Sequence, residues 1–418
     1  MGRRVLGVGA CAFVLASVWA AAAGASSFSN TVLRAPFVLP PGFSSNPANQ
    51  SGDSEPAITF GGPGNTMAVD GLGWLPFAVN LWKGQFGSTP SFFGPMDTSL
   101  PITGKGRVNL GDGDADTSDC TSTVLDTAGA DRPWITHLGT TAWVSYHDSQ
   151  NSSIIRTWKS TDDGVTWRPS GEPLNGLGGI TGGATFNNIQ GPIVADPTTG
   201  NVYDVFAAGE PQTKCCSANY NNVYVARSTD GGAHYTASLV FHAAPFTALN
   251  NIFPSLAVDP VTGKLYAVWS DGHGIWESTS GDHGSTWSMA FKVSNTATSL
   301  MPWVAARGGK VDIVYYGTTA ASQDDPTAIW NVYDSQIQGG SLTVSQVSNV
   351  PNRVGAVCTK GTGCVGGKDR ELLDLFEVAE DPASGKAAII FTNTTFDTWT
   401  SPTTGLHQLP EIVLAYEQ

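Results

Sequence analysis

One turn motif occurs three times in the middle of this chain, and it constrains the fold more than any other feature. The copies are Ser160–Trp167, Ser228–Tyr235 and Ser280–Trp287. Their pattern is Ser-x-Asp-x-Gly-x-Thr-Trp, complete in two copies and altered in the middle one by Tyr for Trp and His for Thr. The Asp carboxylate can accept backbone N–H groups of its own turn, and the Gly supplies a φ that other residues resist. The motif therefore predicts a β-hairpin, repeated.

A second repeat gives the period of the fold. Tight turns of the form Asp-Pro-x-Thr/Ser-Gly begin at Asp196, Asp259 and Asp381, each between a short apolar run and an alternating β-rich run. Their separations are 63 and 122 residues, and the second is close to twice the first, which predicts a further unit between them. Units of the same strand, turn, strand form begin at Met301, Asp131 and Glu55.

Six such units predict an all-β protein, a six-bladed β-propeller with four antiparallel strands per blade. The Ser-Asp-Gly turns are expected between the third and fourth strands of their blades. The 49 glycines and 25 prolines suit many short strands, and no long stretch has a helical apolar period. The repeats continue to the end of the chain, so we expect a single domain over residues 26–418, and a monomer.

The first 25 residues have the pattern of a secretory signal peptide. Arg3 and Arg4 precede the apolar run Val5–Ala23, and Ala23-Gly-Ala25 is a cleavage-type sequence. A retained membrane anchor needs about 20 apolar residues, which this run only just reaches. A lipid-modified Cys11 would leave six apolar residues before it. We therefore expect a secreted, extracellular protein with no membrane span after signal cleavage.

The formal net charge of the chain is −14, and removal of the two leader arginines makes it −14 − 2 = −16. No segment provides the basic stripe that binding to phosphate backbones requires, so nucleic acid is disfavoured as a partner. This negative charge mildly repels an anionic sugar, so a site for such a sugar would need a local group of arginines.

The repeated turn is the Asp-box (BNR) repeat, and on its three copies the chain resembles the sialidase (neuraminidase) superfamily of β-propellers. The resemblance implies a ligand site on the rim opposite the Asp boxes, a glycan or glycoprotein partner, and glycoside hydrolysis of the exo-α-sialidase type. Members of that family hold the sugar carboxylate with three arginines and use a Tyr nucleophile polarised by a Glu, with an Asp as acid and base.

The family's first arginine lies in Phe/Tyr-Arg-Ile-Pro, and the nearest match here is Asp131-Arg132-Pro133-Trp134, with Arg adjacent to Pro. Arg353 and Arg370 can reach the same rim. Arg132 can alternatively join neighbouring blades through a salt bridge. Tyr316 is the outermost of two adjacent tyrosines and is the candidate nucleophile.

Two aspartates occupy equivalent positions just after the second strands of blades 2 and 4. Asp148 and Asp271 are therefore candidates for acid and base, although an Asp at a strand end also serves as a turn cap. On the same rim, Asp131, Trp134 and His147 are candidates for substrate binding. About eleven additional residues, 210–220, lengthen the loop between the second and third strands of blade 3.

An acidic loop provides the one candidate metal site. Asp112, Asp114 and Asp116 place carboxylates at alternate positions, as calcium loops do, but the Gly and Glu of an EF-hand loop are absent. The alternatives are a structural calcium site and a solvated acidic loop. No cofactor is required, since the sequence has no phosphate-binding loop or cofactor fingerprint.

Five cysteines remain after the leader, consistent with an oxidising compartment. Cys358 and Cys364 flank a short loop with two glycines, and we expect a disulfide between them. Cys120 can pair with Cys215 or Cys216, or those two can form a vicinal disulfide. No His accompanies the cysteines at zinc-ligand spacing.

Two functional classes follow: a secreted glycoside hydrolase of sialidase type, and a non-catalytic propeller that binds glycan or protein on the same face. The fold alone does not choose between them.

Overall fold

The computed structural model describes residues 25–35, 42, 44–46, 53–61, 64–73, 79–96, 99–102, 106–109, 125, 130–148, 154–177, 188–209, 220–244, 247–249, 252–360, 364, 370–403 and 405–418. These residues form an all-β structure whose single helical element is the 3-10 turn η1 (Pro173–Leu177). None of them forms a helix with the length and apolar character needed to cross a bilayer. The expected signal peptide lies outside the described residues, apart from its last residue.

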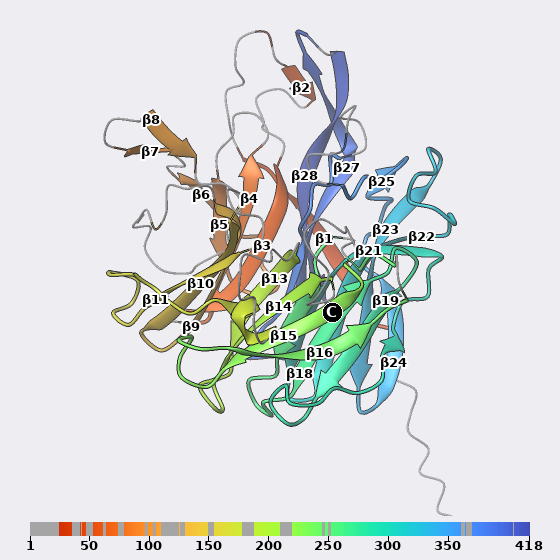
Figure 1. Ribbon diagram of the computed structural model, residues 1–418. Helices are drawn as coiled ribbons and strands as arrows, with labels where there is room; N and C mark the ends of the chain where they lie inside the picture. Colours follow the sequence, from red (N-terminus) through yellow and green to blue (C-terminus); the bar gives the residue numbers. More distant parts are fainter. Residues whose placement is uncertain are drawn as a thin grey trace, which may run out of the picture.

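Six sheets of antiparallel strands surround a common axis, so the predicted six-bladed propeller is confirmed (Figure 1). Blade 1 is β3 (Asp53–Gly61), β4 (Thr66–Gly73), β5 (Val79–Gly84) and β6 (Ser91–Met96). Blade 2 is β9 (Ala130–Leu138), β10 (Thr141–Asp148), β11 (Ile155–Ser160) and β12 (Arg168–Pro169). Blade 3 is β13 (Asn188–Ala195), β14 (Val202–Ala208), β15 (Asn222–Ser228) and β16 (Thr236–His242).

Blade 4 is β17 (Ser255–Val258), β18 (Leu265–Ser270), β19 (Ile275–Ser280) and β20 (Phe291–Lys292). Blade 5 is β21 (Thr298–Arg307), β22 (Lys310–Thr318), β23 (Ile329–Gln338) and β24 (Ser341–Gln346), and β25 (Arg353–Val354) also pairs with β23. Blade 6 contains β26 (Glu377–Glu380), β27 (Ala387–Ser401) and β28 (Gly405–Glu417). Two further elements are β2 (Ser44–Asn46), which pairs with β27, and the hairpin β7 (Ser99–Ile102) with β8 (Gly106–Asn109).

The outer strand of blade 6 comes from the other end of the chain. β1 (Phe28–Leu33) pairs antiparallel with β28, from Phe28 opposite Glu417 to Leu33 opposite Ile412. The N-terminal strand therefore completes the sheet formed by the C-terminal residues and closes the ring. No strand was predicted there, because the six residues carry no repeat and their partner lies almost a full chain length away.

The turns fall on two rims, as antiparallel topology requires. Links from first to second and from third to fourth strands lie on one rim, which we call the back rim. All three Ser-x-Asp-x-Gly segments connect third to fourth strands there. In the first, Asp162 Oδ1 accepts the backbone N–H of Thr166 at 2.8 Å, and Trp167 Nε1 donates to Gly164 O at 2.8 Å.

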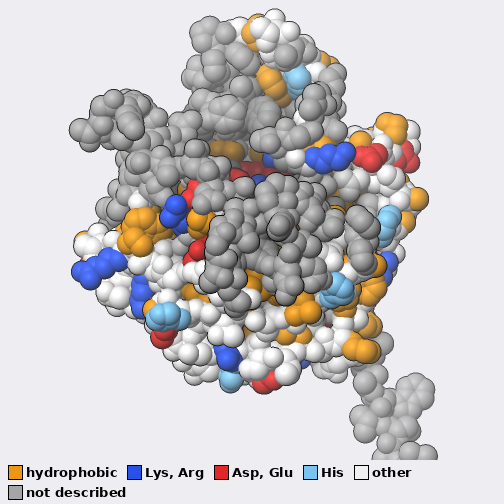
Figure 2. Space-filling view, in the orientation of Figure 1, with side chains coloured by type: hydrophobic (Ala, Val, Ile, Leu, Met, Phe, Trp, Pro, Cys, Tyr) orange, Lys and Arg blue, Asp and Glu red, His pale blue; other side chains and the backbone are white. Residues whose placement is uncertain are grey.

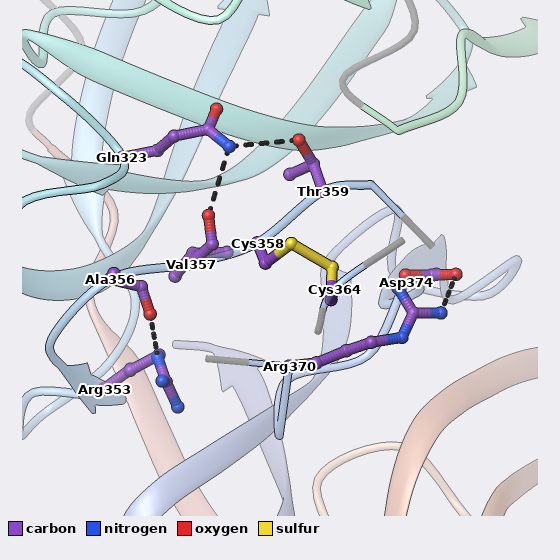
Figure 3. The surroundings of a disulfide bond; sticks show 9 residues. All are labelled: Gln323, Arg353, Ala356, Val357, Cys358, Thr359, Cys364, Arg370 and Asp374. Carbon is purple, nitrogen blue, oxygen red and sulfur yellow. Dashed lines mark hydrogen bonds and ion pairs between the residues drawn. A yellow bond between two sulfur atoms is a disulfide. The ribbon is translucent and has the colours of Figure 1, made fainter. Parts of the chain in front are cut away.

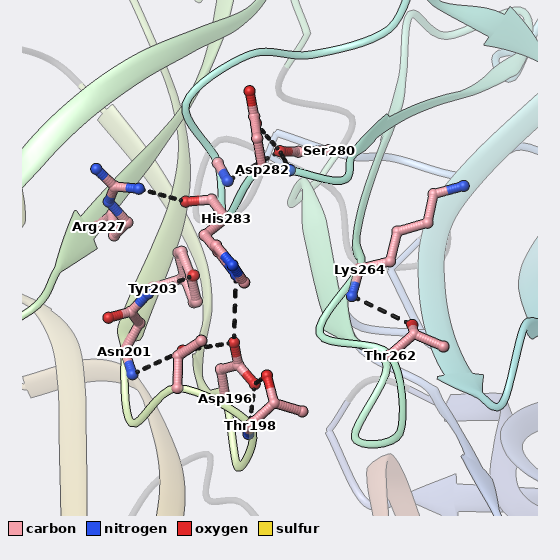
Figure 4. Close-up of polar contacts among 12 residues, drawn as sticks. Asp196, Thr198, Asn201, Tyr203, Arg227, Thr262, Lys264, Ser280, Asp282 and His283 are labelled. Carbon is pink, nitrogen blue, oxygen red and sulfur yellow. Dashed lines mark hydrogen bonds and ion pairs between the residues drawn. The ribbon is translucent and has the colours of Figure 1, made fainter.

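These back-rim turns hold neighbouring blades together (Figure 4). The His283 Nδ1 atom of blade 4 lies 3.8 Å from Asp196 Oδ2 of blade 3, and Arg227 of blade 3 donates to the His283 carbonyl at 2.9 Å. Asp259 similarly accepts the backbone N–H groups of Gly308 and Gly309 of blade 5, at 2.9 and 2.8 Å. The links from second to third strands and from one blade to the next lie on the opposite rim, which we call the front rim.

Candidate functional site

The inner strands of the blades are interrupted at the same level by β-bulges that contain proline. In β3, β9, β13 and β21 the register shifts across Glu55-Pro56, Arg132-Pro133, Gly191-Pro192 and Met301-Pro302, respectively. Proline cannot donate to the strand ladder, so each pair sits where pairing is broken. Glu55, Arg132 and Met301 have φ of 49°, 57° and 54°, a strained conformation for residues other than glycine.

At the front rim, the side chain of one bulge residue contacts another blade. The guanidinium carbon of Arg132 lies 4.8 Å from the ring centroid of Phe253, which precedes the inner strand of blade 4. Phe253 lines a small pocket together with Met301, Trp303 and Asp374. We call this region the axial mouth, formed by Glu55, Arg132, Phe253, Met301, Trp303 and Asp374.

Blade 1 joins the axial mouth through a hydrogen bond to blade 6. The backbone N–H of Asp374 donates to Glu55 Oε1 at 3.1 Å, and both residues are 8% exposed. Glu55 of blade 1 therefore contacts the segment that leads into blade 6. Trp134 supports the mouth from below, because its buried ring contacts Phe253 at 6.0 Å and Trp303 at 5.2 Å between centroids.

Two arginines bring positive charge to this acidic mouth. Arg370 Nη2 donates to Asp374 Oδ2 at 2.7 Å (Figure 3), and Arg132 Nη2 lies 3.2 Å from Asp131 Oδ2. Within the part of the chain that the structure describes, the buried Nη1 atoms of Arg132 and Arg370 find no hydrogen-bond acceptor. A ligand that carries oxygen acceptors can satisfy such donors.

The third predicted arginine is committed to a buried ion pair. Arg353 Nη1 lies 2.6 Å from Glu371 Oε2, with side-chain exposures of 4% and 7%, and Arg353 Nε donates to the Ala356 carbonyl at 2.8 Å. In Figure 3 the guanidinium groups of Arg353 and Arg370 face different partners. Arg132, Arg353 and Arg370 therefore each bind a separate acceptor and do not share one.

Known structures resemble this chain in fold. A protein of unknown function from Dyadobacter fermentans aligns with a TM-score of 0.51 and 12% identity, over 94% of this chain and 100% of that chain. The Trypanosoma rangeli sialidase bound to the inhibitor DANA aligns with a TM-score of 0.50 and 10% identity, over 94% of this chain and 60% of the sialidase. The Penicillium chrysogenum α-L-arabinanase bound to arabinobiose aligns with a TM-score of 0.48 and 10% identity, over 92% of this chain and 98% of the arabinanase.

The chain has a six-bladed propeller fold, which it shares with the Dyadobacter fermentans protein and the Trypanosoma rangeli sialidase. No protein-family model matches its sequence, and no curated protein matches it. At such low identity the likeness concerns the fold alone. Within this propeller fold, the axial mouth lies on the rim opposite the Ser-Asp-Gly turns, which is the rim where the sequence predicts a ligand.

The predicted acid and base lie at the second-strand ends of this propeller. Asp148 is buried, and its Oδ2 lies 2.7 Å from both Nε and Nη2 of Arg156. Asp271 accepts the backbone N–H groups of His273 and Gly274 at 2.9 and 2.7 Å and the Trp276 Nε1–H group at 2.9 Å. The geometry of Asp271 is that of a turn cap, the alternative left open for it.

The remaining predicted residues are distributed between the core and the rim. Tyr316 is fully buried against Phe376, its hydroxyl accepts the Thr392 N–H at 3.1 Å, and burial raises the pKa of that hydroxyl. His147 is half-buried and lies opposite Asp131 in the β9–β10 ladder. The metal candidates Asp112, Asp114 and Asp116 lie outside the described residues, as do Cys120, Cys215 and Cys216.

The predicted disulfide between Cys358 and Cys364 is present (Figure 3). It closes a loop next to the segment that carries Arg370 and Asp374. The loop is attached to blade 5, because Gln323 Nε2 donates to the Val357 carbonyl and the Thr359 hydroxyl, each at 3.1 Å. The disulfide therefore lies in a segment that is attached to blade 5.

Several residues at the front rim were not identified from the sequence. In the sequence, Phe253, Met301 and Trp303 look like core residues. The proline near the start of each of these inner strands was nevertheless a usable signal. Tyr220 lies at the end of the lengthened blade 3 loop, where burial raises the pKa of its hydroxyl and the charge of Arg132 opposes that rise.

A second acidic group lies at the base of the β27–β28 hairpin. Arg34 Nη2 lies 3.0 Å from Asp397 Oδ2, and Arg34 Nε lies 3.7 Å from Glu411 Oε1. Burial, together with the nearby Asp53 and Asp397 charges, raises the pKa of Glu411 to about 9. Figure 2 shows acidic and basic side chains gathered in a hollow below this hairpin.

Proposed function

We propose that this protein acts on the terminal sugar of an extracellular glycan, which it binds at the axial mouth of the propeller. The observation that carries the proposal is the convergence of an aromatic surface, unsatisfied guanidinium N–H groups and two carboxyl groups at one point on the axis. The half-buried Trp303 offers an apolar surface, Arg132 and Arg370 offer donors, and Asp374 offers an acceptor. Sugars require this combination, because they present apolar ring faces edged by hydroxyl groups.

The positions of the arginines favour a substrate whose binding does not require three arginines on one carboxylate. The charge of Arg353 is balanced by Glu371 in a buried pair, and removal of that guanidinium would leave the buried carboxylate uncompensated. Arg132 and Arg370 are the guanidinium groups left for ligand contact among the three predicted. We therefore propose a neutral glycoside as the preferred substrate and a sialoside as the weaker one.

Asp374 and Glu55 are the residues that we propose as the acid and base pair of a glycoside hydrolase. Glycosidases generally use two carboxyl groups, one ionised and one protonated, on either side of the scissile bond. Asp374 Oδ2 lies 2.7 Å from Arg370 Nη2, and the Asp374 N–H donates to Glu55 Oε1 at 3.1 Å, so the two proposed residues lie together at the mouth. Secretion is part of the proposal, supported by the leader pattern and by the Cys358–Cys364 disulfide.

The test is turnover of a panel of fluorogenic glycosides, neutral and sialylated, by the purified chain. We expect at least one neutral glycoside to be hydrolysed, and Asp374→Asn and Glu55→Gln to lower kcat by about 100-fold or more. The matched control is Asp163→Asn, which removes an exposed back-rim carboxylate at a position with φ of 61° that Asn tolerates. Unchanged kcat in both mouth variants would refute the assignment of Asp374 and Glu55.

A non-catalytic glycan-binding propeller is the second candidate. It is favoured by the ion pairs of the front-rim carboxylates, since Asp131, Asp148, Glu371 and Asp374 each lie within 3.2 Å of an arginine nitrogen. Carboxylates held in this way contribute to binding geometry without proton transfer. Saccharide binding at the mouth with no turnover of any glycoside would establish this function.

A further inference from the structure

A cluster of carboxyl groups is buried at the seam between blades 5 and 6, on the back rim and away from the axial mouth. Lys310 of β22 lies 2.9 Å from Asp312 Oδ2 and 2.7 Å from Glu417 Oε2, and it also donates to the Gly385 carbonyl at 3.0 Å. Gln336 Nε2 bridges Asp312 and Glu417 at 3.0 Å each. Side chains of blade 5 therefore bind the last residues of the C-terminal strand.

Glu417 is also the point where the two ends of the chain meet. Its Oε1 accepts the Ser26 hydroxyl at 3.0 Å, and its Oε2 accepts the Ala387 N–H at 2.8 Å. In the register of β1 and β28, Glu417 pairs with Phe28. The seam cluster, which we define as Lys310, Asp312, Asp334, Glu380 and Glu417, thus sits beside the strand pair that closes the ring.

The cluster contains four carboxyl groups and one ammonium group. Lys310 pairs with Asp312 and Glu417, and neither carboxyl oxygen of Asp334 has a hydrogen-bond partner among the described residues. Asp334 is 0% exposed and Glu380 is 8% exposed. Burial of uncompensated charge is costly enough that such groups take up protons instead. The arrangement therefore requires protons on Asp334 and Glu380.

We propose that the seam cluster is a proton-dependent latch between blades 5 and 6, closed while Asp334 and Glu380 carry protons and weakened when they lose them. Burial and the nearby Asp312 carboxylate raise the pKa of Glu380 to about 10, and the same two causes raise the pKa of Asp334. The charged and titratable groups that face the pair are Arg307 on β21, Lys310, Asp312 and Tyr315 on β22, Glu417 on β28 and Tyr266 on β18.

The sign of the effect follows from proton linkage. In the unfolded chain both carboxyl groups titrate near pH 4, whereas in the folded chain they hold their protons to much higher pH. Between those values the folded state binds more protons than the unfolded state, so stability falls as pH rises. The latch is strongest in mildly acidic surroundings and loosens toward alkaline pH.

The experiment is urea unfolding of the full chain at several pH values from 5 to 9, for the wild type, Glu380→Gln and Asp324→Asn. Gln mimics the protonated side chain, so the slope of log Kunf against pH should fall by about one unit in Glu380→Gln. Asp324 is an exposed carboxyl group, and its variant should keep the wild-type slope. Equal slopes in the wild type and Glu380→Gln would overturn the proposal.

Two further measurements keep the test decisive if Glu380→Gln does not fold. Asp334→Asn, measured in the same way, should show the same loss of slope. In the wild type alone, amide protection factors of β1 and β28 should decrease from pH 6 to pH 9 relative to those of β15 in blade 3. A wild type whose stability is constant or rises over this range would contradict the latch.

Discussion

The guanidinium carbon of Arg132 lies 4.8 Å from the ring centroid of Phe253, so a side chain of blade 2 contacts the residue that leads into blade 4. The contact exists because Arg132 occupies a proline bulge with φ of 57°, which turns its side chain out of the pleat of β9. A strained residue of this kind persists where the surrounding structure determines it. The axial mouth is therefore built from backbone irregularities shared by several blades.

Replacement of Arg353 separates its role from that of Arg132. We predict that Arg353→Ala lowers the free energy of unfolding by about 3–5 kcal/mol, because Glu371 is left buried without its cation. Arg132→Ala should lower it by about 1 kcal/mol or less, since a partly exposed cation–π contact is lost. Urea denaturation of both variants measures the difference. Equal losses would contradict the distinction between a structural and a ligand-facing arginine.

Gly191 permits the close approach of blades 3 and 4. A Cβ atom there would lie 2.0 Å from the Pro254 carbonyl oxygen, which is backbone and cannot move aside. We predict that Gly191→Ala destabilises the fold by about 1–3 kcal/mol. Gly281→Ala is the matched control, because nothing lies within 4 Å of its Cβ position, and its effect should be about 0.5 kcal/mol or less. Similar values for the two variants, from urea unfolding, would contradict this packing argument.

The Asp282 carboxylate makes stability sensitive to acid. Hydrogen bonds from the Thr286 hydroxyl, the Thr286 N–H and Ser280 hold the pKa of Asp282 well below its usual range. A depressed folded-state pKa contributes stability above the unfolded pKa, near 4, and that contribution is lost as pH falls below it. We predict that Asp282→Asn lowers the thermal midpoint at pH 6 and loses less on acidification from pH 4 to pH 2.5 than the wild type does. Parallel midpoint curves would argue against it.

The Cys358–Cys364 disulfide should contribute modestly to stability and strongly to the mouth. A closed loop of this length contributes about 2 kcal/mol by the chain-entropy relation. We therefore predict that the double variant Cys358→Ser, Cys364→Ser unfolds at lower urea concentration and loses protection of the amides from Leu372 to Phe376. Retained protection there would show that the loop does not fix Asp374.

The blade count was predictable because hairpin turns need local residue types. The Asp carboxylate and the Gly of each turn act within eight residues, so the whole turn motif can be recognised in the sequence alone. The closure by β1 was not predictable in this way, since Phe28 pairs with Glu417 and no local pattern links them.

The candidate site was likewise predictable only in part. Arg132 was a candidate from its motif, and it lies on the rim opposite the Ser-Asp-Gly turns. That this rim binds a ligand stays a prediction. Phe253 and Met301 were missed because apolar residues before proline look like ordinary core, and only the structure shows that they line a pocket with Asp374. The partnership of Arg353 with Glu371 depends on a loop path that no spacing rule describes.

Equilibrium binding of a glycan, selected on a glycan array, to the wild type, Arg132→Ala and Asp163→Asn decides whether the axial mouth is the ligand site. We predict that Arg132→Ala weakens binding by about tenfold or more, as expected for loss of a hydrogen bond to a charged donor. Asp163→Asn, altered on the back rim, should bind as the wild type does. Wild-type affinity in Arg132→Ala, or weakened binding in Asp163→Asn, would contradict the assignment of the ligand to the axial mouth.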